Sequence, residues 1–186
     1  STSNIVVTAV PGAGKTTFLV ECAKSIPGSL VLAYNRELRN IMVQLMEGHS
    51  TKCMTFHELC GHVLGMCRDD DEMEEWVDYG EKNGSVNGKC SVLMIDEAQD
   101  LRPLYVRLIN LVRPTRIILV GDAMQTVYDY DGATTAYMDD PAHEWPGEWQ
   151  RLSLSLSYRL TSENAAFARS VCGGETIRTR KHGPSP

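Results

Sequence analysis

Residues 9–17 constrain this chain more than any other stretch. They read Ala-Val-Pro-Gly-Ala-Gly-Lys-Thr-Thr and directly follow an apolar, β-branched run at 5–7. A glycine-rich turn between a strand and a helix allows successive backbone N–H groups to point at phosphate oxygens, and the start of the helix adds the positive end of its dipole. In such a loop Lys15 reaches the β- and γ-phosphates, and the Thr16 hydroxyl coordinates Mg²⁺. The sequence therefore predicts a phosphate-binding loop for a nucleoside triphosphate, formed by Gly12, Ala13, Gly14, Lys15, Thr16 and Thr17.

Composition and charge limit the class of protein. The chain has 186 residues, enough for one domain with a full core, and no apolar run approaches the roughly 20 residues that span a bilayer. Its six cysteines are too sparse for a disulfide scaffold, so we expect free thiols in an intracellular chain of the cytoplasm or nucleus, without a membrane partner. The net charge of −6 argues against a generally basic nucleic-acid-binding surface, but it leaves room for a local one.

Short apolar segments alternate with longer helical patterns along the chain. Helices are expected at 15–25, 36–47, 56–67 and 104–111 and from Thr161 onward, and strands at 5–9, 30–33, 53–55, 91–95, 116–120 and 152–156. Polar residues fill 69–90 and 139–150, which we expect to form an insertion and a loop. The alternation implies an α/β fold, with a mostly parallel sheet and helices on both of its faces. Polar groups that follow the strands should then meet at the carboxyl edge of the sheet.

Two carboxylates follow the most apolar of these strands. Residues 92–95, Val-Leu-Met-Ile, lead directly into Asp96 and Glu97. Phosphoryl transfer to water needs a cation that neutralises the developing charge and a base that orients the nucleophile. We therefore predict that Asp96 holds Mg²⁺, directly or through water, and that Glu97 is the general base. The competing interpretation, a solvated strand end, is disfavoured by the phosphate loop upstream.

The next apolar strand repeats the arrangement. Residues 117–120 are followed by Gly121-Asp122 and then by Gln125. A glutamine at such a position can bond a γ-phosphate oxygen or the attacking water. Arg159 precedes an expected helix, and its planar guanidinium suits phosphate oxygens. Each signal is weak alone, and together they predict that Gln125 and Arg159 sense the γ-phosphate and act with Lys15 and Glu97 in catalysis.

Taken together, these segments resemble the UvrD/Rep-type superfamily 1 DNA helicases. Motif I of that family resembles residues 9–16, and motif II resembles 95–100, Ile-Asp-Glu-Ala-Gln-Asp, whose Gln-Asp pair is characteristic of the family. The resemblance covers nearly the whole chain, because the remaining motifs Ia, Ib, III and IV resemble residues 33–36, 55–59, 121–133 and 158–164.

The resemblance implies a P-loop NTPase domain, namely the first of two RecA-like domains, with ATP and Mg²⁺ as cofactors. This ATP-binding domain would occupy residues 1–175, with 69–90 replacing a larger family subdomain. Residues 176–186 would lead toward the second RecA-like domain, in the same chain or in a partner. Tyr158 is expected to pack on the adenine. The resemblance also implies a track for single-stranded DNA, or RNA, that contacts Tyr34, Asn35, Thr55, His57, Tyr128 and Tyr130.

The chain departs from the family pattern at several positions. Ala9 replaces the usual first glycine of the loop, and Thr17 stands where many members have an adenine-contacting arginine. Asp129 and Asp131 put acids beside the expected stacking platform, where they would weaken binding to phosphodiesters. Motifs V and VI, which carry the arginine finger of the family, do not occur in these residues. We therefore expect the isolated chain to be a weak or inactive ATPase.

The function expected from these residues is that of an ATP-hydrolysing motor domain of a DNA helicase, with 3′ to 5′ translocation and duplex unwinding by the intact enzyme. One alternative is a nucleic-acid-binding switch that ATP gates without translocation. Another is a different P-loop enzyme, such as a small-molecule kinase. The cysteines and histidines at 53–67 raise the question of a zinc site, but their scattered spacing favours buried thiols.

Overall fold

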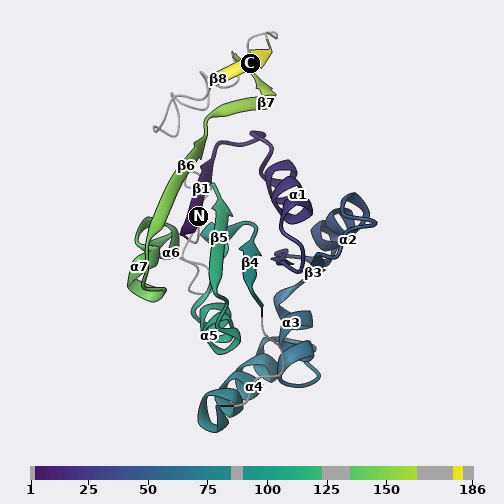
Figure 1. Ribbon diagram of the computed structural model, residues 1–186, viewed down its shortest axis with the longest axis vertical. Coiled ribbons are helices and arrows are strands. Elements are labelled where there is room, and N and C mark those ends of the chain that lie inside the picture. Colours follow the sequence, from purple (N-terminus) through teal and green to yellow (C-terminus); the bar gives the residue numbers. More distant parts are fainter. Residues whose placement is uncertain (1–2, 85–89, 123–134, 163–177, 182–186) are drawn as a thin grey trace.

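A six-stranded parallel sheet forms the centre of the molecule (Figure 1). The computed structural model describes residues 3–84, 90–122, 135–162 and 178–181. The strand order is β3-β2-β4-β5-β1-β6, and each neighbouring pair is parallel. The predicted α/β fold is confirmed, and its strands are Asn4–Ala9 (β1), Leu30–Leu32 (β2), Lys52–Met54 (β3), Val92–Ile95 (β4), Arg116–Gly121 (β5) and Trp149–Leu154 (β6).

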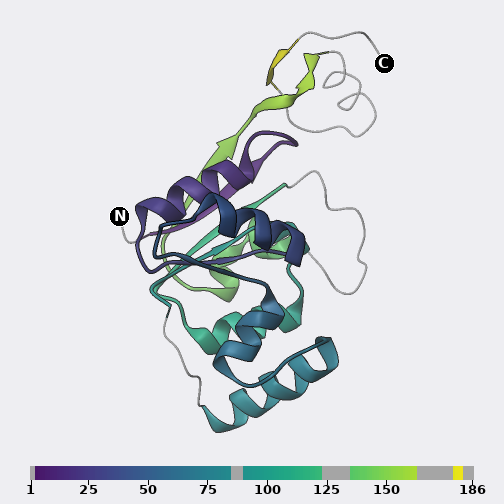
Figure 2. The same cartoon turned by 90° about the vertical axis from the view of Figure 1, so that its right-hand side faces the viewer.

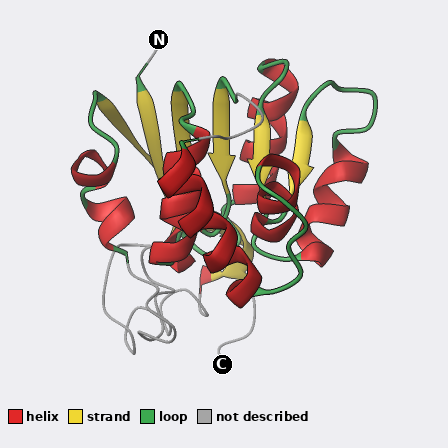
Figure 3. Cartoon of the chain, turned by 90° about the horizontal axis from the view of Figure 1, so that it is seen from below, coloured by secondary structure: helices red, strands yellow, loops and turns green. Residues whose placement is uncertain are grey.

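Helices cover both faces of the sheet, because successive side chains of a strand point to opposite faces. Val7, Val31 and Met94 form a buried cluster with α1 (Lys15–Ser25) and α2 (Arg36–Leu45). On the other face, Val6 and Leu93 belong to a larger cluster that includes residues of α3 (Phe56–Val63), α4 (Asp70–Asn83), α5 (Pro103–Val112) and α6 (Ala136–Asp139). Trp145, which directly follows α7 (Pro141–Glu144), belongs to the same cluster. Figure 3 shows the helices around the row of strands.

The polar segment 69–90, predicted as an insertion, contains helix α4. Asp69 caps this helix, since its side chain accepts a hydrogen bond from the backbone N–H of Glu72 at 2.9 Å. Three acids in the first turn complement the helix dipole. Met73, Val77 and Gly80 are buried at helical spacing, so α4 packs as an outer layer beside α3 and α5 (Figure 2).

The expected loop at 139–150 instead contains helix α7 and the start of β6. Pro141 is the first residue of α7, a position at which its missing N–H leaves no hydrogen bond unmade. Beyond β6 the chain continues as β7 (Leu156–Thr161), which pairs in parallel with β8 (Arg178–Lys181) and extends away from the main sheet (Figure 2). Thr161, expected to open a helix, is the last residue of β7.

No helix within the described ranges is long and apolar enough to cross a lipid bilayer.

Candidate nucleotide-binding site

The predicted phosphate loop links β1 to α1 at the carboxyl edge of the sheet. Gly12 and Gly14 have φ angles of 73° and 88°, in the left-handed region that glycine adopts without steric cost. Gly14 is the N-cap of α1 and offers no side-chain acceptor, so the first N–H groups of the helix are left for an external anion. The predicted loop therefore has the backbone conformation that phosphate binding requires.

Neighbouring strands hold this loop in place. The backbone N–H of Val10 donates to the carbonyl of Leu154 at the end of β6, at 3.0 Å. The Ser157 hydroxyl, at the start of β7, donates to the carbonyl of Pro11 at 2.8 Å. The segment that continues into Tyr158 and Arg159 thus begins against the phosphate loop. The side chains of Tyr158 and Arg159 lie outside the described part of the structure.

Asp96 is buried at the end of β4, with 2% of its surface exposed. Its Oδ1 accepts a hydrogen bond from the backbone N–H of Glu97 at 2.9 Å. Burial, and secondarily the Glu97 carboxylate, raises the pKa of Asp96 to about 6. A carboxylate that is costly to ionise gains most from a nearby cation. Asp96 and the half-buried Thr16 hydroxyl supply the hard oxygen ligands that Mg²⁺ prefers, so these residues fit such an ion.

Glu97 forms an ion pair with Lys15. Its φ of 49° is unusual for a residue other than glycine and marks a turn directly after β4. This turn brings Glu97 Oε2 to 2.6 Å from Lys15 Nζ, with both side chains largely shielded from solvent. The structure therefore brings together the predicted phosphate-binding lysine and the predicted general base, which are 82 residues apart in the chain.

Gln99 is a site residue that the sequence interpretation did not assign. It lies in the short 3₁₀ helix Ala98–Asp100 (η1), and only 2% of it is exposed. Its Nε2 donates to Glu97 Oε2 at 2.8 Å and, less closely, to Asp100 Oδ2 at 3.3 Å. Its Oε1 accepts from the backbone N–H of Asp122, after β5, at 2.9 Å. The sequence feature that could have pointed to Gln99 was the Gln-Asp pair that follows the two acids.

Four of the residues predicted to contact DNA lie at the carboxyl ends of β2 and β3. Tyr34 is 46% exposed there and is available for stacking. Asn35 and Thr55 use their side-chain oxygens as N-caps of α2 and α3, accepting from the backbone N–H groups of Leu38 and Glu58. His57 Nε2 lies 3.0 Å from Asp70 Oδ1, so this imidazole is engaged within the chain. Gln125, Tyr128 and Tyr130 lie outside the described residues.

The cysteines and histidines at 53–67 pack without forming a candidate metal site. Among the described residues no group of three or more His, Cys, Asp or Glu side chains could hold a metal ion. Burial raises the pKa of Cys53 and that of Cys60 to about 12, which keeps both thiols protonated at neutral pH. Both therefore pack as small apolar groups.

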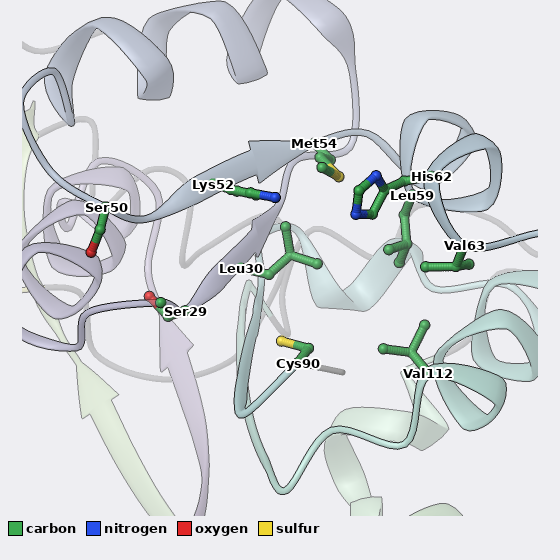
Figure 4. A pocket seen from close by; sticks show the side chains of 11 residues that line it. Ser29, Leu30, Ser50, Lys52, Met54, Leu59, His62, Val63, Cys90 and Val112 are labelled. Carbon is green, nitrogen blue, oxygen red and sulfur yellow. The ribbon is translucent and has the colours of Figure 1, made fainter. Parts of the chain in front are cut away.

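A separate pocket lies at the opposite, amino-terminal edge of the sheet (Figure 4). It has a volume of about 150 Å³, and Leu30 and Lys52, the first residues of β2 and β3, line it together with Cys90 and His62. Since the phosphate loop and the acids lie at the carboxyl ends of the strands, this pocket is not part of the nucleotide site.

Comparison with known proteins identifies the family. The family model described as "AAA domain" matches residues 1–131. The F-box DNA helicase protein 1 of Schizosaccharomyces pombe is 29% identical over 98 residues, 52% of this chain and 11% of that protein. The ATP-dependent DNA helicase UvrD2 of Mycobacterium tuberculosis is 28% identical over 127 residues, 67% of this chain and 17% of that protein. The chain thus spans less than a fifth of the curated relatives that it matches.

Solved structures support the same fold. The complex of Arterivirus nonstructural protein 10, a helicase, with DNA matches 100% of this chain and 43% of its own, with a TM-score of 0.61 and 12% identity. A structural similarity at such low sequence identity shows a shared fold and nothing more. The family match, by contrast, covers well over half of the chain and includes the phosphate loop, both acids and Gln99. The chain therefore belongs to the AAA domain family, as a RecA-like domain of the superfamily 1 helicase type.

Proposed function

We propose that this chain is the ATP-binding and ATP-hydrolysing motor domain of a DNA helicase. The observation that carries the proposal is the 2.6 Å contact between Lys15 Nζ and Glu97 Oε2, formed beside the buried Asp96 at the carboxyl ends of β1 and β4, which flank β5. A phosphate-binding cation, a candidate general base and a candidate metal ligand then share one sheet edge. Hydrolysis of a nucleoside triphosphate requires these three groups.

Each group has a separate role in the proposed reaction. Lys15 leaves Glu97 and pairs with the β- and γ-phosphates of ATP, while the N–H groups at the start of α1 bond the phosphate oxygens. Glu97 then accepts a proton from the attacking water. Thr16 and Asp96 would hold Mg²⁺, and the ion would neutralise charge on the transferred phosphoryl group. Gln125 and Arg159 contact the γ-phosphate, and Tyr158 packs on the adenine.

Single-stranded DNA is the proposed second ligand, with RNA as the other nucleic acid that the same track can accept. Both curated relatives are named as DNA helicases. Tyr34 is exposed at the carboxyl edge of the sheet, where base stacking is worth about 1–3 kcal/mol per base and tolerates any sequence. Residues 1–175 would act with a second RecA-like domain, reached through 176–186 or supplied by a partner. Their UvrD-type motifs favour 3′ to 5′ movement and duplex unwinding inside the cell.

The decisive experiment measures ATP turnover with and without single-stranded DNA, using the longest natural polypeptide that contains this chain. We expect DNA to stimulate turnover, because a motor couples hydrolysis to its track. A nucleic-acid-binding switch would bind DNA without such stimulation, and a small-molecule kinase would respond to a metabolite instead. Either of these results would contradict the proposal.

A variant of Glu97 tests the assignment of the base. We expect Glu97→Gln to lower kcat by about 10²–10⁴-fold, because an amide cannot accept the proton, and to leave nucleotide affinity largely intact. Glu75→Gln on the exposed side of α4 is the matched control, and its turnover should equal that of the wild type. Unchanged hydrolysis by Glu97→Gln would remove Glu97 from its proposed role.

A further inference from the structure

The Gln99 amide joins the proposed general base to the neighbouring strand. In the described part of the chain, two side chains donate to the same oxygen, Glu97 Oε2: Lys15 Nζ at 2.6 Å and Gln99 Nε2 at 2.8 Å. The proposed reaction requires Lys15 to turn to the phosphates of ATP. When it does, Gln99 remains as a donor to Glu97 Oε2.

The orientation of this amide is fixed on both sides. Gln99 Oε1 accepts from the backbone N–H of Asp122, while Nε2 faces the carboxylates of Glu97 and Asp100. A flipped amide would place its oxygen against two carboxylates and its NH₂ group against an N–H donor. Because Gln99 is also almost fully buried, water cannot compensate for such a change. The donor is therefore preorganised toward Glu97.

Gly121 makes this arrangement sterically possible. A Cβ atom at this position would lie 2.5 Å from Gln99 Oε1 and 2.5 Å from the sulfur of Met138. The Met138 side chain is flexible, but the Gln99 oxygen is held by the adjacent Asp122 N–H. Any side chain at residue 121 would consequently push the Gln99 amide away from the end of β5.

The geometry points to Gln99 as the positioning residue of the general base. Its NH₂ group holds Glu97 Oε2 after Lys15 has moved to the nucleotide, so that the other oxygen, Oε1, faces the attacking water. Gln99 thus acts through Glu97 without contacting ATP. This inference rests on the proposed hydrolytic function, and it adds a residue whose contribution is confined to turnover.

Two substitutions of Gln99 separate this role from a structural one. Gln99→Met keeps the length of the side chain and removes both its donor and its acceptor. Gln99→Glu keeps an acceptor for the Asp122 N–H and replaces the donor with a carboxylate that repels Glu97. We expect both variants to lower kcat by about 100-fold, as a small misplacement of a reacting group does, with the KM for ATP and the affinity for ADP unchanged. A residue that only held β5 would retain activity in Gln99→Glu.

Gly121→Ala tests the same arrangement without altering Gln99. We expect it to reproduce the selective loss of kcat, because the added methyl group displaces the Gln99 oxygen. Ser29→Ala is the matched control, since Ser29 is equally buried but lies at the opposite edge of the sheet. Its kcat and KM should equal those of the wild type. Thermal unfolding of every variant, followed by circular dichroism, verifies that each is folded under the assay conditions.

The outcomes distinguish the inference from the function on which it rests. If the wild-type protein hydrolyses ATP and Gln99→Glu does so equally fast, Gln99 is not a positioning residue and the proposed function stands. If both Gln99 variants raise KM or weaken ADP binding to the same extent that they lower kcat, Gln99 supports the whole site and the inference fails. If the wild-type protein itself shows no turnover with DNA, the proposed function and the inference fail together.

Discussion

Two groups of polar and charged residues, one at the sheet edge and one among the helices, differ in how they affect the pKa of their carboxyl groups. The sheet-edge cluster comprises Lys15, Asp96, Glu97, Gln99 and Asp100, which lie at or near the ends of β1 and β4. The helix-layer cluster comprises His57 on α3, Asp70 on α4, and Arg102 and Tyr105 at the start of α5. Each contains a carboxylate within 3 Å of a cationic side chain. Their surroundings nevertheless shift carboxyl pKa values in opposite directions.

At the sheet edge, burial raises the pKa of Asp96 and that of Asp100, and the Glu97 carboxylate adds to both shifts. In the helix layer, the hydrogen bond from Arg102 lowers the pKa of Asp70. Arg102 itself lies over the Tyr105 ring, 4.2 Å from its centre, and Tyr105 stacks on Phe56 at 4.1 Å. The helix-layer charges are paired with one another within the fold, and these ion pairs stabilise it. At the sheet edge, the ionised forms of Asp96 and Asp100 reduce stability until a cation binds, as is common for functional sites.

The largest expected effect comes from removing the cation of the sheet-edge cluster. Lys15→Met should weaken ATP binding and lower kcat/KM by about 10³-fold, because a charge that stabilises the phosphates is lost. Steady-state ATP hydrolysis and titration with a fluorescent nucleotide measure the two effects. Lys24→Met is the control, since Lys24 lies on the same helix and pairs with the exposed Glu21, at 3.1 Å. Wild-type affinity and turnover in Lys15→Met would show that this cluster does not bind phosphate.

A second substitution, Asp96→Asn, should stabilise the fold and abolish hydrolysis. Because the pKa of Asp96 is raised to about 6, ionising this group costs the folded state stability at every pH above that value. Asp96→Asn removes the cost, so at pH 8 and without ligands it should stabilise the protein by up to about 3 kcal/mol. The gain should shrink as pH falls from about 6 toward 4 and vanish by about pH 3, where the carboxyl group is protonated in both states. Mg²⁺-dependent hydrolysis should be lost.

Urea denaturation at pH 8 and at about pH 3 measures the gain in stability and its loss in acid. Asp100→Asn offers a graded comparison: Asp100 also has a raised pKa but is less buried than Asp96, so its stabilisation should have the same sign and a smaller size. If Asp96→Asn were destabilising at pH 8, the conclusion that the sheet-edge cluster raises the pKa of Asp96 would be wrong.

Much of the sheet-edge cluster could be predicted from the sequence. Each member follows an apolar strand, and the parallel topology brings strand ends to one edge whatever their distance along the chain. Local residue patterns therefore located the Lys15 loop and the acids at 96 and 97. The hydrogen bond from the Asp122 N–H to Gln99 Oε1 could not be predicted in this way, because it depends on the position of the Asp122 backbone and on the space left by Gly121. The Lys15–Glu97 ion pair likewise depends on the left-handed turn at Glu97.

The helix-layer cluster could not be predicted from residue patterns. Asp70 and Arg102 are 32 residues apart, and nothing in either neighbourhood specifies how α4 crosses α5. The sequence pattern predicts the polar segment at 69–90 only as an insertion. In the structure its buried positions, Met73 and Val77, dock the helix, and docking then carries Asp70 to Arg102. Tertiary packing determines which residues meet in the helix-layer cluster, whereas sheet topology determines which residues meet in the sheet-edge cluster.

The smallest expected effect comes from the helix layer. Asp70→Asn should destabilise the protein at neutral pH by about 1 kcal/mol, a value that allows for solvent screening of a pair whose carboxylate is 40% exposed. A carboxyl group with a lowered pKa stabilises the fold above its ordinary pKa and loses this effect as pH falls through the lowered value. The difference from wild type should therefore be constant from pH 8 to about pH 5 and shrink in stronger acid.

Asp71→Asn is the matched control for this prediction. Asp71 shares the first turn of α4 and the same helix dipole, but it is exposed and lies outside the helix-layer cluster. Subtracting its effect from that of Asp70→Asn isolates the contact with Arg102 and His57. Urea denaturation at several pH values supplies the measurement. If the two variants lost equal stability at every pH, the Asp70 contacts would contribute nothing beyond the helix dipole, and the helix layer would depend on its apolar residues alone.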